Sequence, residues 1–241
     1  MKKGIVYRST GSWYTVQSEG VFYECRIKGK LRLKGIKSTN PVAVGDWVYF
    51  EVDSHANANE GNITKIEERQ NYIVRKSVNL SKQTHIIASN IDQVFLIVTL
   101  NNPPTFPAFI DRFLVTAEAY QIPAIILFNK IDTYSKLELE EITLLQKTYE
   151  NIGYSTYLIS AIQDEGIEKV KELMQDKVSM FSGHSGVGKS TLVNAISPSL
   201  DLKTAAISKQ HQQGMHTTTF AEMFALSNGI KIIDTPGIKG F

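Results

Sequence analysis

A stretch of nine residues constrains this chain more than any other feature of its sequence. GHSGVGKST, residues 183–191, places Gly183 and Gly188 around four residues and follows the second glycine with Lys189 and Ser190. Small residues at this spacing let backbone N–H groups close around a phosphate at the start of a helix. The lysine then reaches the β- and γ-phosphates, and the serine hydroxyl binds Mg²⁺. The chain is therefore predicted to bind a nucleotide.

The segments around this loop alternate between strand and helix patterns. Apolar runs predict strands at 91–100, 124–128, 155–161, 178–182, 220–229 and 230–234. Apolar residues at helical spacing predict helices at 109–120, 136–153 and 166–174, and a further helix from residue 191. This alternation indicates an α/β domain with a mostly parallel sheet and helices on both faces.

Two motifs directly after predicted strands indicate which base is bound. Asn129, Lys130 and Asp132 belong to the run NKID. A carboxylate accepts hydrogen bonds from two guanine N–H donors that adenine lacks, so we expect Asp132 to select guanine, with Asn129 and Lys130 bracing the base. Ser160 and Ala161 follow the next strand and are expected to offer a backbone N–H to the guanine carbonyl oxygen.

The last strand and the loop before it predict the metal site. Asp234 opens the run DTPG and is expected in the Mg²⁺ shell, while the N–H of Gly237 can meet a γ-phosphate oxygen. The run GMHTTT, residues 214–219, offers hydroxyls for a second protein ligand of Mg²⁺. We assign this role to Thr218, with Thr217 and Thr219 as alternatives. The residues expected to contact GTP or GDP are Asn129, Lys130, Asp132, Ser160, Ala161, Gly183, His184, Ser185, Gly186, Val187, Gly188, Lys189, Ser190, Thr191 and Gly237.

The order of these motifs is unusual. An ordinary GTPase domain runs from the phosphate loop through a switch threonine and DxxG to NKxD and the Ser-Ala strand. Here the order begins with NKID and finishes with DTPG. This is a circular permutation of the same sheet, which frees the DTPG loop to transmit switch motion to a partner on its C-terminal side.

Residues 1–72 have a different character. Five short runs rich in β-branched and aromatic residues, at 4–9, 13–18, 21–29, 46–52 and 61–69, are separated by turn residues and predict a small five-stranded β-barrel of the oligonucleotide-binding (OB) type. Residues 1–90 hold 14 lysines and arginines against 8 acidic residues, whereas the remainder is mildly acidic. We therefore expect an RNA-binding barrel at 1–72, a linker at 73–90 and the permuted GTPase domain at 91–241.

One basic stretch of the barrel is the candidate RNA contact. It contains Arg26, Lys28, Lys30, Arg32 and Lys34. Contact with a phosphate backbone is the sharper interpretation; a solvated edge strand protected by lysines is the alternative. The aromatic residues Trp13, Tyr14, Trp47 and Tyr49 could stack on bases, but strand aromatics more often belong to a core, so none is assigned a role.

Composition excludes several other classes of protein. No apolar run approaches the roughly 20 residues of a membrane span, and the first residues lack the apolar stretch of a signal peptide. The single cysteine, Cys25, excludes an internal disulfide and a multi-cysteine zinc site within these residues, and is interpreted as a buried strand residue. We expect a cytoplasmic monomer.

The combination of an N-terminal barrel with the order NKID, SA, GHSGVGKST, GMHTTT, DTPG and GIKGF resembles the family of ribosome small subunit-dependent GTPase A over essentially the whole chain. The resemblance implies late maturation of the 30S subunit, contact of the barrel with 16S rRNA, and low intrinsic GTPase activity that the subunit stimulates. The family continues past GIKGF into a helical segment with a Cys/His zinc site, so zinc is expected only in a longer form.

The catalytic groups are incomplete. Ile238 follows DTPG, where many GTPases carry a water-orienting glutamine, and Arg112, in a predicted helix, is the only arginine after residue 90. Slow hydrolysis is therefore expected without a partner. His216 is the candidate for orienting water, and a loop histidine without that role is the alternative; His184 is expected to serve shape rather than acid–base chemistry. The competing function is a non-hydrolysing RNA adapter that binds GTP or GDP.

Overall fold

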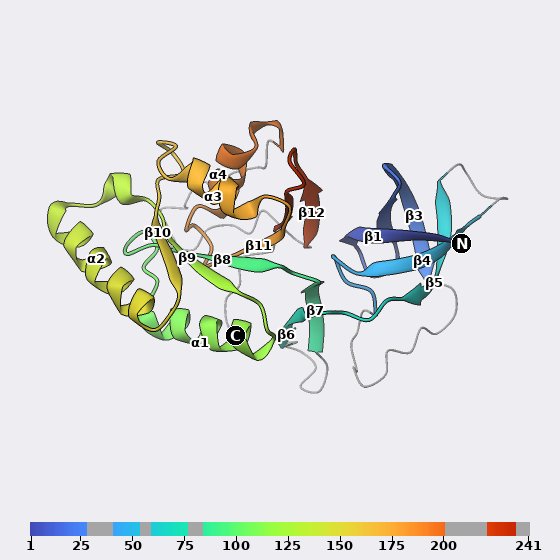
Figure 1. Ribbon diagram of the computed structural model, residues 1–241, viewed down its shortest axis with the longest axis horizontal. Coiled ribbons are helices and arrows are strands. Elements are labelled where there is room, and N and C mark those ends of the chain that lie inside the picture. Colours follow the sequence, from blue (N-terminus) through green and yellow to red (C-terminus); the bar gives the residue numbers. More distant parts are fainter. Residues whose placement is uncertain (28–40, 54–58, 77–83, 201–220, 235–241) are drawn as a thin grey trace, which may run out of the picture. The chain divides into compact units, whose positions relative to one another are not determined.

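The computed structural model describes residues 1–27, 41–53, 59–76, 84–200 and 221–234 (Figure 1). The chain forms two compact units, one made of Met1–Ile91 with Phe220–Phe224, the other of Asp92–Thr219 with Ala225–Phe241.

Five strands of the first unit close into a barrel. They are β1 (Lys2–Ser9), β2 (Tyr14–Ser18), β3 (Val21–Ile27), β4 (Trp47–Val52) and β5 (Glu60–Ile66). Their order is β1-β2-β3-β5-β4, and pairing of β4 with β1 completes the circle. Every pair is antiparallel except β3 with β5. The predicted five-stranded OB-type barrel is confirmed.

Alternation along these strands explains the barrel core. Inward-facing residues such as Val16, Val48 and Phe50 are fully buried, while their neighbours along the strand lie outside. Cys25 is also completely buried, as its interpretation required, and burial raises the pKa of its thiol to about 12. Tyr14 is buried too, so of the four aromatic residues considered for base stacking it belongs to the core.

The expected linker at 73–90 contains paired strands. β6 (Tyr72–Lys76) and β7 (Thr84–Ser89) form an antiparallel pair. Ala88 of β7 also forms an isolated parallel β-bridge with Val44. The N–H of Ser89 donates to the Val44 carbonyl at 2.9 Å. Two runs of five and six residues separated by a polar stretch are too short for periodicity alone to reveal them.

A buried ion pair lies beside this segment, which contacts it through Ser89. Arg69 donates from Nε and Nη2 to the two carboxylate oxygens of Asp46, both at 2.6 Å. The Ser89 hydroxyl donates to the same carboxylate at 2.6 Å, and the N–H of Ala43 does so at 2.8 Å. Asp46 is fully buried and the Arg69 side chain nearly so. Four hydrogen bonds therefore compensate the buried charge of Asp46.

The second unit is built on a parallel sheet. Its strands lie in the order β10-β9-β8-β11-β13, and every neighbouring pair is parallel. The bounds are β8 (Gln93–Val98), β9 (Ala124–Phe128), β10 (Ser155–Leu158), β11 (Val178–Ser182) and β13 (Lys231–Asp234). The expected α/β architecture with a mostly parallel sheet is confirmed.

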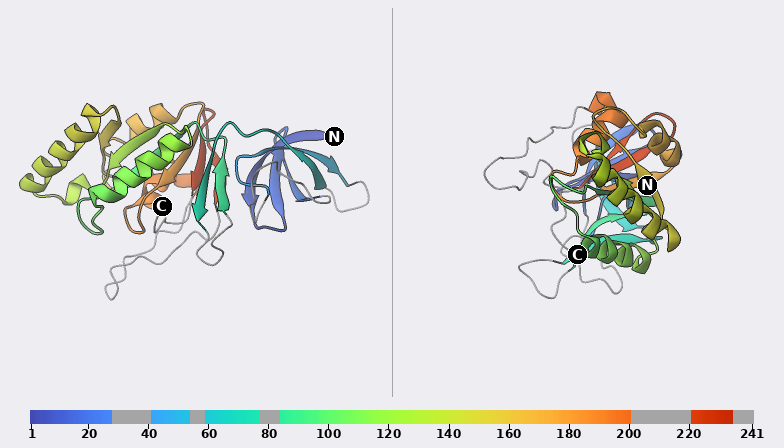
Figure 2. Two further views of the ribbon diagram at one scale, coloured as in Figure 1. Left: turned by 90° about the horizontal axis from the view of Figure 1, so that it is seen from below. Right: turned by 90° about the vertical axis from the view of Figure 1, so that its left-hand side faces the viewer.

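Helices cover both faces of this sheet. They are α1 (Pro107–Ala119), α2 (Lys136–Asn151), α3 (Ile167–Met174) and α4 (Lys189–Ile196). α1 lies across the sheet from α3 and α4 (Figures 1 and 2). A proline in the first turn starts α1, and a reciprocal capping box between Ser135 and Glu138 starts α2. Short 3₁₀ turns occur at Ile131–Thr133 and Pro198–Leu200.

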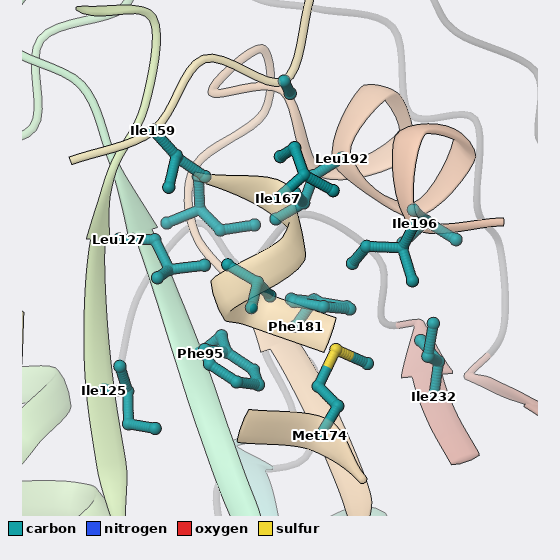
Figure 3. Close-up of a cluster of buried hydrophobic side chains, with 14 of the residues drawn as sticks. Phe95, Ile125, Leu127, Ile159, Ile167, Met174, Phe181, Leu192, Ile196 and Ile232 are labelled. Carbon is teal, nitrogen blue, oxygen red and sulfur yellow. The ribbon is translucent and has the colours of Figure 1, made fainter. Parts of the chain in front are cut away.

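The core between the sheet and α3 with α4 fixes the position of the phosphate loop. Phe95 and Phe181, on neighbouring strands, stack with ring centroids 5.3 Å apart. Ile167 and Met174 of α3 and Leu192 of α4 pack in the same cluster (Figure 3). Because α4 begins directly after the loop, this packing holds both ends of the loop on the sheet.

β12 (Glu222–Ala225) precedes β13. The chain reverses between them at a turn where the N–H of Leu226 donates to the Ile230 carbonyl at 2.8 Å. Among the described residues, none of the helices is long and apolar enough to cross a membrane.

Candidate nucleotide site

The sequence motifs meet at the carboxyl ends of the parallel strands. β11 lies between β8 and β13, and the loop at 183–188 leads from its end into α4. NKID follows β9, and Ser160 with Ala161 follows β10. Ligands of open α/β sheets bind in the crevice outside these strand ends. The site is therefore built where the topology of the sheet requires it.

Glycine is required at two positions of the phosphate loop. Gly183 adopts a φ of +148°, and a Cβ there would overlap the carbonyl of Ile97. Gly188 adopts a φ of +99°, and a Cβ there would overlap the side-chain amide of Asn129. The loop therefore lies directly against the NKID motif, which leaves no room for a larger residue.

Lys189 is a buried cation inside the loop. Its Nζ donates to the Gly183 carbonyl at 2.9 Å and to the His184 carbonyl at 2.7 Å. Burial lowers the pKa of Lys189 to about 8, against a smaller opposing effect of Asp234. Neutral carbonyls compensate a buried ammonium only in part, and a phosphate would do so more fully. The donor set of the loop thus fits a polyphosphate.

Asn129 connects three parts of the site. Its Nδ2 donates to the Val187 carbonyl at 2.8 Å, and its Oδ1 accepts from the N–H of Ala161 at 3.1 Å. The side chain is 2% exposed. Asn129 therefore fixes the NKID loop against the phosphate loop on one side and against the Ser-Ala segment on the other.

Lys130 extends along the same loop. Its backbone is left-handed, with φ of 68°. Its Nζ donates to the Gly186 carbonyl at 2.8 Å and to the Asn102 carbonyl at 2.5 Å. Burial lowers the pKa of Lys130, and the charge of Asp132 opposes this shift. The stem of the side chain thus spans the region between the NKID motif at 129–132 (the base motif) and the phosphate loop.

Asp132 is exposed at the start of the 3₁₀ turn. The hydroxyl of Ser160, which is fully buried, donates to its Oδ1 at 2.5 Å. The same hydroxyl accepts from the N–H of Gln163 at 3.1 Å. Ser160 thus holds the carboxylate by one oxygen and leaves the group accessible for the paired donors of a guanine.

His184 packs against a helix. Its ring lies 3.9 Å from that of Phe109 in α1, at an interplanar angle of 32°. Burial, with a smaller effect of Lys189, lowers the pKa of His184, which favours the neutral imidazole. This contact agrees with the expected role in shape, because a stacked neutral ring anchors the loop.

Sequence reasoning missed Tyr134. Its hydroxyl donates to the Asn129 carbonyl at 3.0 Å and accepts from the N–H of Leu100 at 2.9 Å. Tyr134 is 9% exposed, and burial raises the pKa of its phenol. It joins the loop after β8 to the base motif. Phe109 was missed as well, because its stacking on His184 depends on the chain path and has no local sequence signal.

Part of the expected metal site is described. Asp234 ends β13, is 4% exposed and pairs in register with Phe181 of the phosphate-loop strand. Ser190 and Thr191 lie in the first turn of α4, directly after Lys189. His216, Thr217, Thr218, Thr219 and Gly237 lie outside the described residues. The described segments hold no group of three His, Cys, Asp or Glu side chains suited to a metal ion, so a metal here would depend on hydroxyl and phosphate oxygens as well.

The barrel places one member of the basic stretch. Arg26 is exposed on β3, with its guanidinium 3.8 Å from the centroid of the Trp13 ring. Lys28, Lys30, Arg32 and Lys34 lie outside the described residues.

Comparisons with known proteins agree with both units. Residues 66–241 match the family model described as RsgA GTPase, and residues 3–63 match that of the RsgA N-terminal domain. The chain is 66% identical over 240 residues to the small ribosomal subunit biogenesis GTPase RsgA of Christiangramia forsetii, covering 99% of this chain and 76% of that protein. It is 66% identical over 239 residues to the protein of the same name from Flavobacterium johnsoniae, covering 99% and 74%.

Solved structures give the same result. YjeQ from Thermotoga maritima superposes with a TM-score of 0.73 at 34% identity, over 98% of this chain and 74% of that one. YloQ, described as a circularly permuted GTPase, superposes with a TM-score of 0.67 at 30% identity, over 100% and 72%. The motif order of this chain is that of the permuted sheet. The chain belongs to the RsgA GTPase family and is a GTP hydrolase.

Proposed function

We propose that this GTPase acts in biogenesis of the small ribosomal subunit, with a low intrinsic rate that the 30S subunit raises. The curated relatives carry this role in their names. The observation that carries the proposal is the 66% identity to these two relatives over nearly the whole chain. The direct bonding of Asn129 to the phosphate loop supports the GTP-binding part of it, because it brings the NKID motif and the phosphate loop into one site. Activity on the ribosome implies a cytoplasmic protein, and we expect the chain to act as a monomer.

Different residues of the site would contact the base and the phosphates of the nucleotide. Asp132 would accept from two guanine donors, and the N–H groups after β10 would meet the guanine carbonyl oxygen. Lys189 would neutralise the β- and γ-phosphates, whose negative charge compensates its buried ammonium. The backbone of the phosphate loop would donate to the β-phosphate. The side chains of Asp132 and Lys189 and the backbone of Ala161 are already held by hydrogen bonds within the fold.

Mg²⁺, when bound, would supply positive charge that offsets the negative charge of the phosphates. Ser190 and Thr218 would bind it through hydroxyls, with Thr217 or Thr219 as alternatives to Thr218. Asp234 would act from the metal shell, and its position beside the phosphate-loop strand supports this role. Gly237 would donate its N–H to the γ-phosphate.

The experiment that tests the function is phosphate release from GTP with and without purified 30S subunits. We expect slow release alone and a large increase with subunits. A full-length relative such as the RsgA protein of C. forsetii serves as the positive control, because this chain spans 76% of that protein. Lys189→Ala is the negative control. Tight GTP binding by this chain without stimulated release, under conditions in which the full-length relative is stimulated, would favour the non-hydrolysing RNA adapter.

The same assay tests His216 as the group that orients the attacking water. Ile238 cannot hydrogen-bond to this water, whereas a histidine beside three threonines on the same loop could reach it. His216→Ala should leave GTP affinity within about threefold and lower 30S-stimulated turnover by about tenfold to a thousandfold. Intrinsic turnover should fall much less. If stimulated turnover is unchanged by the substitution, a group of the ribosome and not His216 orients the attacking water.

Contact of the barrel with 16S rRNA is tested through salt dependence. Replacing Lys28, Lys30 and Arg32 with alanine should weaken binding to the subunit and lower the salt slope by about one for each lost phosphate contact. Arg26, exposed over Trp13, is expected to contribute with Lys34. Nucleotide affinity should not change. An unchanged slope would support the alternative of a solvated edge strand.

A further inference from the structure

A second surface of the barrel has no part in the nucleotide site. Trp47 of β4 is 39% exposed, although tryptophan within a barrel strand normally packs inside. Tyr49, two residues further along, points to the same face and is half-buried. The intervening Val48 is fully buried in the core. The two rings therefore lie side by side on the outside of the barrel.

Lysines from both neighbouring strands flank these rings. In register, Tyr49 is opposite Lys3 of β1 on one side and Lys65 of β5 on the other. The Lys3 Nζ lies 5.0 Å from the Trp47 centroid and 5.9 Å from that of Tyr49, and the Lys65 Nζ lies 5.6 Å from the Tyr49 centroid. Cations at these distances are attracted to the faces of the rings. The three adjacent strands thus present two aromatic faces between two ammonium groups.

We propose that Trp47, Tyr49, Lys3 and Lys65 form a stacking platform for single-stranded RNA. The aromatic faces would stack on two successive bases, and the lysines would bind the flanking phosphates. Two positions along a strand span about 6.7 Å, which suits bases that have been separated from each other. Stacking needs no particular sequence, so the platform would read unpaired RNA rather than a specific motif. The proposal deepens the proposed role in ribosomal subunit biogenesis and rests on it for the source of the RNA.

The lysines of the platform are available to bind phosphate groups of an RNA strand. Lys3 forms an ion pair with Glu67 at 2.7 Å, but both side chains are well exposed, at 44% and 37%. Exposed ion pairs of this kind contribute little stability, so phosphate can displace the carboxylate at small cost. Glu67 also makes the surface less basic, which leaves the rings as the main source of affinity. A duplex would bind the platform weakly, because its bases are already stacked on each other and cannot stack on the rings.

The chain contains a matched control. Phe22 of β3 is 49% exposed, at least as much as Trp47, and its ring lies edge-on to Tyr7. No lysine of the described residues lies over the Phe22 ring. Phe22→Ala therefore removes an exposed aromatic ring of the same barrel without touching the platform.

The test measures binding of the full chain to a labelled oligouridylate of about twelve nucleotides by fluorescence anisotropy. Trp47→Ala and Tyr49→Ala should each weaken binding by about 5- to 100-fold, while Trp47→Phe should retain most of the affinity. Lys3→Ala and Lys65→Ala should each lower the salt slope by about one. Phe22→Ala should bind like the wild type. A matched RNA duplex should compete poorly.

Four outcomes overturn the platform: undetectable binding by the wild type at low salt, wild-type binding by both ring variants, an equal loss in Phe22→Ala, or a loss of 30S binding with no loss for the oligonucleotide. The last would show that the occupant is a ribosomal protein or folded rRNA and not a single strand. Thermal unfolding and GDP binding of each variant show that the chain remains folded. Because free RNA is the probe, failure of the platform leaves 30S-stimulated GTP hydrolysis untouched, so the two proposals are tested separately.

Discussion

The side-chain amide of Asn129 donates to the backbone carbonyl of Val187 at 2.8 Å, across 58 positions of sequence. One residue of the base motif therefore holds the backbone of the phosphate loop directly. The neighbouring Gly188 permits this approach, because any Cβ there would overlap the Asn129 amide. We therefore expect recognition of the base and binding of the phosphates to be coupled through this contact.

Gly188→Ala should reduce affinity for GTP and GDP by at least about tenfold, because the methyl group must displace Asn129 while the left-handed backbone is strained. Gly153→Ala is the matched control. Gly153 has a φ of +102° and no atom within 4 Å of a built Cβ, so it should cost about 1 kcal/mol of stability without affecting nucleotide affinity. Isothermal titration calorimetry of both variants checks this. Equal affinities in both would remove the coupling role from the Asn129 contact.

Asp132→Asn should weaken GTP and GDP binding by more than about tenfold, because a charge-assisted hydrogen bond contributes roughly 1.5–3 kcal/mol. The variant should gain relative affinity for xanthosine nucleotides, whose exocyclic oxygen suits an amide donor. Ser160→Ala removes only the hydroxyl that orients the carboxylate, and should have a smaller effect of the same sign. Competition titrations with GDP and XDP measure both, and unchanged GDP affinity in Asp132→Asn would exclude Asp132 from the base pocket.

Nucleotide affinity should fall as the pH rises through about 8. Burial lowers the pKa of Lys189 to about 8 in the nucleotide-free protein, so its ammonium loses a proton from this pH upward. Phosphates favour the charged form, so binding raises this pKa and takes up a proton. Calorimetry in two buffers of different ionisation enthalpy detects this uptake. In Lys189→Arg the side chain stays charged at these pH values, so the part of the pH dependence that comes from Lys189 should be absent. Titration of the guanine base affects the variant and the wild type equally. A pH dependence equal to that of the wild type would contradict the assignment.

Arg69→Ala should destabilise the barrel unit by about 3–5 kcal/mol, because it leaves the carboxylate of Asp46 buried without its cation. Both tryptophans of the chain, Trp13 and Trp47, lie in this unit, so their fluorescence during urea unfolding reports on it alone. Affinity for GDP should remain at the wild-type value. A loss below about 1 kcal/mol would show that water or a neighbouring group replaces the guanidinium.

Local sequence patterns predicted the motifs and most of the elements, but not the strands β6 and β7. Period-2 alternation identified the five barrel strands, and strand–helix alternation identified the parallel sheet, because both patterns repeat within a few residues. The order of NKID, the phosphate loop and DTPG identified the permutation. Since parallel strands end at one edge of a sheet, the motifs after them were expected to meet, and Asn129, Ser160 and Lys189 do lie there.

Only the folded chain shows how distant segments support that site and which barrel faces are exposed. Nothing local marks Tyr134 as the link between Asn129 and Leu100, or Phe109 as the partner of His184. Alternation shows that Trp47 and Tyr49 share a face, but not that this face lies outside while Tyr14 is buried. Such contacts depend on the path of the chain between the partners, and local periodicity carries no information about that path.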